Sequence, residues 1–99
     1  MNKFIAILAA HVADGELQPS QTAGRLVLGA LRREPLRKVV EMLPNIVLFE
    51  FDGDRVQAYQ FLVSKIEPHH KMIVMELQGF FSAVGLGETT NLIHKFFQQ

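Results

Sequence analysis

The sequence contains no cysteine, and its ten basic residues are balanced by ten acidic ones. Without cysteine the chain has no disulfide framework and no thiolate chemistry, which fits a cytoplasmic protein. No apolar run is long enough to cross a bilayer, so we expect no membrane contact. The neutral balance also argues against independent nucleic-acid binding, because proteins that bind nucleic acid by themselves are usually more basic.

Recognisable catalytic patterns are missing as well. The sequence has no phosphate-binding glycine loop, no nucleophile elbow and no dinucleotide-binding glycine pattern. His69 and His70 are adjacent and close to Glu67, but metal ligands must converge on one point, and neighbouring side chains diverge. We therefore expect exposed turn histidines rather than a metal site, no cofactor, and a protein that is not an enzyme.

The composition is that of one globular domain over residues 1–99, with 48% hydrophobic and 20% charged residues. In its central stretch, apolar residues recur at spacings of three and four between Leu36 and Leu43. This spacing predicts a helix, which Pro44 ends. The β-branched and aromatic segment Ile46–Phe51 then predicts a short strand.

The remaining apolar patterns also favour helices. After the strand, a three-and-four spacing predicts a helix capped by Asp52 or Asp54. The fold class is therefore mainly α, a small helical domain with one short strand. The predicted helices cover Phe4–Val12, Ser20–Arg33, Leu36–Leu43, Arg55–Glu67, Lys71–Val84 and a last segment from Leu92 to Phe97.

The second of these helices carries signals at both ends and two glycines inside. Ser20 resembles an N-cap, and Arg32-Arg33 would complement the negative end of the helix dipole. Gly24 and Gly29 lower helix propensity. We expect close packing against another helix to explain both glycines.

A lone strand has to find a partner, because its backbone groups must be hydrogen-bonded. One alternative is a hairpin through Asp52-Gly53, which would make a winged helix. The other is pairing with its own copy, and the nearly all-apolar helix Lys71–Val84 also favours a second subunit. This alternative predicts an intertwined homodimer. Its interface would contain Ile46, Leu48, Phe49 and Phe51.

Charge is unevenly distributed along the neutral chain. Five basic residues and only one acidic residue, Glu34, lie between positions 25 and 38. One interpretation is a solvated helix face, and the other is a patch for phosphate or an acidic partner. The basic residues are Arg25, Arg32, Arg33, Arg37 and Lys38.

Three short motifs follow one another between Leu26 and Asp54. They are Leu28-Gly29-Ala30-Leu31, then Leu36-Arg37-Lys38 with Glu41, then Phe49-Glu50-Phe51-Asp52. In these motifs the chain resembles the D subunit of the bacterial flagellar master transcriptional activator. It departs from that family by lacking the longer N-terminal region and the cysteine of the strand-like segment.

The resemblance implies a homodimeric, mainly helical protein with a helix-turn-helix-like unit after Asp52. Such a protein would act with a second regulatory subunit of the C type as a transcriptional activator on promoter DNA. We therefore expect a DNA-binding regulator subunit, and the alternative is a small helical protein-binding adaptor or anti-activator without direct DNA contact. The candidate DNA contacts are Arg32, Arg33, Arg37, Lys38, Arg55, Lys65, His69, His70 and Lys71.

Overall fold

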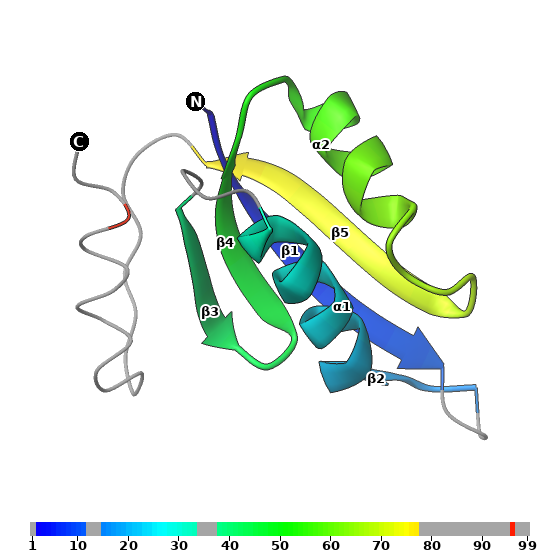
Figure 1. The fold of residues 1–99 in the computed structure, drawn as a ribbon. Helices are drawn as coiled ribbons and strands as arrows, with labels where there is room; N and C mark the ends of the chain where they lie inside the picture. The colour runs from blue at the N-terminus through cyan, green and yellow to red at the C-terminus, as the bar shows by residue number, and fades with distance from the viewer. Residues whose placement is uncertain (1, 12–14, 34–37, 78–95, 97–99) are drawn as a thin grey trace.

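The described residues form an antiparallel β-sheet of five strands with two helices on one face (Figure 1). The computed structural model describes residues 2–11, 15–33, 38–77 and 96. The elements are β1 Asn2–His11, β2 Leu17–Pro19, α1 Gln21–Arg32, β3 Val39–Leu43, β4 Ile46–Phe51, α2 Arg55–Val63 and β5 His70–Leu77.

The expected mainly helical fold is wrong, because three segments predicted as helices are strands. The described part of Phe4–Val12, up to His11, falls in β1, Leu36–Leu43 ends in β3, and Lys71–Val84 begins in β5. The last predicted helix, from Leu92 to Phe97, lies outside the described residues except for Phe96.

The strand β1 is the centre of the sheet. On one edge it pairs with β5 from Lys3 to Ala10. On the other edge it pairs first with β4, over residues 2–7, and then with β2, over residues 9–11. The remaining strand, β3, pairs with the outer edge of β4. Apart from the short β2, the order βαββαβ is that of the ferredoxin-like split βαβ arrangement.

The two helices begin where the sequence predicts. The Ser20 hydroxyl accepts a hydrogen bond from the Ala23 amide at 3.1 Å, which caps α1. At α2, the Asp54 carboxylate accepts from the Gln57 amide at 2.8 Å, and the Gln57 side chain accepts from the Asp54 amide at 2.9 Å. This reciprocal capping box makes the segment after Asp52 a helix, so the hairpin and the winged helix are wrong.

The main core lies between the helices and the sheet. Phe4 and Phe49, from the neighbouring strands β1 and β4, are fully buried there with ring centroids 5.5 Å apart. The other buried members are Ala6, Leu8, Val47, Ala23, Val27, Leu28, Leu31, Ala58 and Leu62. Below the sheet, a smaller cluster joins Val40, Leu48 and Phe96.

These two clusters explain why the helical spacing was misleading. Val39 packs against the helix-side core, whereas Val40 belongs to the cluster on the opposite face. A strand that is apolar on both faces loses the alternation of apolar and polar residues that distinguishes it from a helix. In β3 the apolar residues therefore matched the helical spacing by coincidence.

In the described part of the chain, neither helix is long and apolar enough to pass through a membrane.

Candidate protein-interaction edge

The strand β5 forms one side of the sheet. Among the described strands it pairs with β1 and with no other. Its opposite edge therefore carries backbone N–H and C=O groups that no described strand pairs. Such an edge is a template for a further strand.

The hydrogen bonds of β1 identify the residues whose groups point outward. The Leu8 amide donates to the Asn45 carbonyl at 2.8 Å, and the Leu8 carbonyl accepts from the Ser20 amide at 3.0 Å. Both bonds lie on the edge of β1 away from β5. Because backbone groups alternate in direction along a strand, Ile7 and the other odd-numbered residues of β1 turn toward β5.

The pairing of β1 with β5 then shows which backbone groups of β5 point toward β1. Ile7 pairs with Ile73, and Ile5 pairs with Met75. The odd-numbered residues of β5 are therefore hydrogen-bonded to β1. The backbone groups of Met72, Val74 and Glu76 point away from β1, along the open edge.

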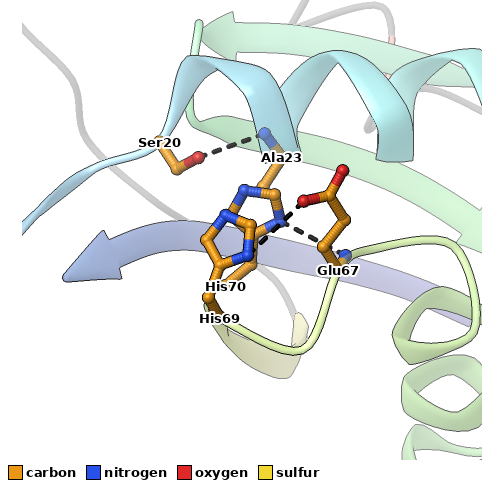
Figure 2. Close-up of polar contacts among 5 residues, drawn as sticks. All are labelled: Ser20, Ala23, Glu67, His69 and His70. Atoms are coloured by element: carbon orange, nitrogen blue, oxygen red, sulfur yellow. Dashed lines mark hydrogen bonds and ion pairs between the residues drawn. The ribbon is translucent and has the colours of Figure 1, made fainter.

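At the start of β5, the outward-pointing amide of His70 is already hydrogen-bonded within a turn. The His70 amide donates to the Glu67 carbonyl at 3.0 Å, and the Glu67 amide donates to His70 Nδ1 at 3.3 Å. Figure 2 shows the Glu67 and His70 contact beside the Ser20 cap of α1, with His69 paired to the Glu67 carboxylate at 3.4 Å. The open edge therefore starts at Met72 and runs to Glu76.

A groove runs along this edge beneath α2. Near the N-terminus of α2 it has a volume of about 540 Å³, between Asp54-Arg55 on the helix and Glu76 on the strand. Further along it has a volume of about 380 Å³, where it is lined by Val56 and Tyr59 of the helix and by Met72, Ile73 and Val74 of the strand. One wall is thus helix and the other is the strand edge.

The groove and the strand beside it expose apolar side chains. On α2, Val56 and Tyr59 are 52% and 44% exposed, and Val63 follows on the same helix face at 41%. On β5, Ile73 and Met75 point to the sheet face away from the helices and are 57% and 46% exposed. Exposed apolar side chains therefore lie on both sides of the open edge, and clustered exposed apolar side chains mark interaction sites.

The residues predicted for a dimer interface lie elsewhere. Ile46, Leu48, Phe49 and Phe51 belong to β4, whose two edges are paired with β1 and β3. Phe49 is fully buried and Leu48 is 2% exposed. The reason for placing them at an interface, an unpaired strand, therefore does not hold.

The predicted DNA contacts that the structure describes are distributed over several elements. Arg32 and Arg33 are exposed at the end of α1, and Lys38 is exposed just before β3. Arg55 begins α2, and Lys65, His69 and Lys71 are exposed between α2 and the start of β5. His70 is buried at 7% exposure, which corrects the expectation of two exposed histidines. Arg37 lies outside the described residues.

No helix-turn-helix follows Asp52 in the described chain. The helix α2 is followed by a turn and then by the strand β5, where a recognition helix was expected. The described sheet also offers no aromatic platform for bases, because Phe4, Phe49 and Phe51 all pack on the helix side.

The sequence contained one signal for the β5 edge. Met72–Met75 is a run of four apolar residues, two of them β-branched, and it follows Pro68 closely. A short apolar run between turn residues is equally compatible with a buried strand and with a helix segment.

In comparisons with known proteins, no family model, no curated protein and no solved structure matches this chain.

Proposed function

We propose that this protein is a protein-binding module that takes up an extended polypeptide strand at the outer edge of β5. The observation that carries the proposal is the combination of an open strand edge, Met72–Glu76, with an apolar helix wall alongside it. In strand addition, main-chain hydrogen bonds supply affinity, and pockets for alternate side chains supply specificity. This edge and groove offer both.

The apolar wall and the scarcity of charge distinguish this edge from one that is protected against pairing. Natural proteins protect edge strands with charge, proline or bulges. Here the outward-pointing stretch has one charged residue, Glu76, at its end, and Val56 and Tyr59 stand beside it. Burial of an exposed apolar side chain contributes about 1.5–3 kcal/mol when it is complete. Partly exposed side chains contribute correspondingly less, and the main-chain hydrogen bonds of an added strand must supply part of the affinity as well.

Selection of a random peptide library against the whole protein tests this proposal. We expect the enriched peptides to alternate apolar and polar residues and to shift the amide resonances of Met72, Val74 and Glu76. In a protein that light scattering finds monomeric, peptides that shift only resonances elsewhere, or the absence of enriched peptides, would contradict it.

The matched variant is Val74→Pro. It removes an outward N–H without removing a hydrogen bond to β1, so the fold should persist, as circular dichroism can check. We expect it to weaken peptide binding at least tenfold. Unchanged affinity in the folded variant would place the bound peptide away from the edge.

DNA binding is a second candidate, favoured by the charge of α1. Arg25, Arg32 and Arg33 are exposed along this helix and at its end, and the helix contains no acidic residue. The attraction would be to phosphate and would weaken with salt. Because the whole chain is neutral, a second regulatory subunit would have to supply the remaining contacts.

A gel-shift titration with such a subunit tests the second candidate. Arg25→Glu with Arg32→Glu should lower affinity similarly for all DNA sequences, as loss of phosphate contacts does. Arg55→Glu with Lys65→Glu reverses the same number of charges at the start of α2 and just after its end. Because these two residues are also candidate contacts, comparing the two double variants shows which set of basic residues meets DNA. Equal shifts for wild type and both double variants would remove the case for DNA.

A further inference from the structure

We infer that the strand added at β5 is β5 of a second copy of this chain, in a two-fold symmetric dimer. The inference rests on the proposed strand addition and names its partner. It follows from the self-complementarity of Met72–Glu76 and of the groove beside it.

Symmetry restricts how two such edges can meet. A closed dimer needs a two-fold axis, and its interface uses the same patch on both subunits. For antiparallel neighbours this axis is perpendicular to the sheet, so both helix layers lie on the same side. Each residue of β5 must then face a residue that points to the same side of the sheet.

The outward backbone groups select one register. If Val74 lies opposite Val74 of the second copy, Met72 lies opposite Glu76, and all three outward-pointing residues form hydrogen-bonded pairs. Centring the strands on Ile73 instead would require the His70 amide, which already donates to Glu67 at 3.0 Å. Centring them on Met75 would leave Met72 without a partner among the described residues of β5, which ends at Leu77. Only the register centred on Val74 therefore pairs every open group.

The same register also pairs the exposed apolar side chains. It places Ile73 opposite Met75 of the second copy, and Met75 opposite Ile73, on the face away from the helices. These are non-hydrogen-bonded pairs, in which facing side chains come closest. Side chains that are 57% and 46% exposed in the single chain would thus cover each other.

The charged residues of β5 and the position of α2 are also compatible with this register. Lys71 would face Leu77 and Glu76 would face Met72, so no like charges lie opposite each other. On the helix side, the two copies of α2 would run antiparallel across the axis. Val56 and Tyr59, which line the groove beside β5, would face their own counterparts. A second copy therefore supplies both the strand and the apolar wall that covers it.

Register-specific disulfide formation tests the inference, because the natural chain has no cysteine. Ile73→Cys and Met75→Cys are purified separately, mixed under reducing conditions and then oxidised gently. Facing residues in such a pair have Cα atoms about 4.5 Å apart, which a disulfide can bridge. We expect the mixture to form cross-linked dimers and each variant alone to remain largely unlinked.

Leu17→Cys is the control, since Leu17 on β2 is exposed to the same extent, 58%. Its mixture with either variant should not cross-link above background. Equal cross-linking of Ile73→Cys or Met75→Cys alone would overturn the register. A mixture that does not cross-link, in a protein that light scattering finds monomeric at 100 μM, would overturn the dimer.

The outcomes separate this inference from the proposed function. A monomer that still binds selected peptides at Met72, Val74 and Glu76 would remove the second copy and keep strand addition. A monomer that binds no peptide there would remove both.

Discussion

At the residue scale, two glycines of α1 have opposite roles. Gly24 is buried against the turn between β3 and β4, where an added methyl group would overlap the Pro44 carbonyl oxygen. Gly29 is exposed, and a methyl group there would meet nothing within 4 Å. The close packing expected for both glycines thus exists at Gly24 alone, and its partner is a turn rather than a helix.

This contrast gives a paired prediction. Gly24→Ala should lower the free energy of unfolding by about 1–3 kcal/mol, because backbone atoms must move to admit the methyl group. Gly29→Ala should raise it by about 0.5–1 kcal/mol, because alanine favours the helix more than glycine does. Urea denaturation of the two variants measures both changes. A stabilising Gly24→Ala would show that α1 does not pack against Pro44.

The Asp54 cap is a second residue-scale feature. Asp54→Ala removes the acceptor for the Gln57 amide and should cost about 1 kcal/mol of stability. Asp52→Ala, an exposed change two residues earlier, should stay within about 0.5 kcal/mol of wild type. Thermal unfolding monitored by circular dichroism compares them. Equal losses would mean that charge, rather than capping, stabilises this turn.

At the element scale, β4 contributes two aromatic side chains to the helix side of the sheet. Phe49 and Phe51 both point to the helix side, but Phe49 is fully buried whereas Phe51 is half-buried against Phe61, with ring centroids 5.6 Å apart. Because residues two apart in a strand share a face, the two aromatic rings belong to the same layer. Because Phe49 is more deeply buried than Phe51, we expect it to contribute more to stability.

Phe49→Ala should therefore cost about 3–5 kcal/mol, the range for a buried phenylalanine. Phe51→Ala should cost clearly less, because its ring is already partly in contact with water. Chemical denaturation monitored by circular dichroism measures both. If the two losses are equal, or Phe51→Ala is the more damaging, β4 does not face the helices as described.

At the scale of the whole molecule, the two edges of β5 should differ in hydrogen exchange. The amides of Ile73 and Met75 point to β1 and should be protected at any protein concentration. The amides of Met72, Val74 and Glu76 should become protected only as concentration rises and the second copy adds its strand. Exchange measured by NMR at 20 and 500 μM tests this. Outward amides that exchange equally fast at both concentrations would contradict pairing across β5.

Features that depend only on neighbouring residues can be predicted from the sequence. Ser20 and Asp54 start α1 and α2 because their side chains bond backbone amides three residues away. The strand Ile46–Phe51 was predicted with its exact limits, because β-branched and aromatic residues between turn signals leave little alternative. The start of α2, which forms one wall of the candidate site, could therefore be predicted from the sequence.

Whether β1, β3 and β5 are strands or helices, and which strand lies at the open edge, depend on contacts between distant parts of the chain. These strands carry apolar residues on both faces, so their sequences lack the alternation that marks a strand. Their pairing also joins residues far apart in the chain, such as Ala10 with His70. Among the described strands, β5 lies at one edge because it pairs only with β1, whose other side is taken by β4 and β2, and no local pattern contains that information.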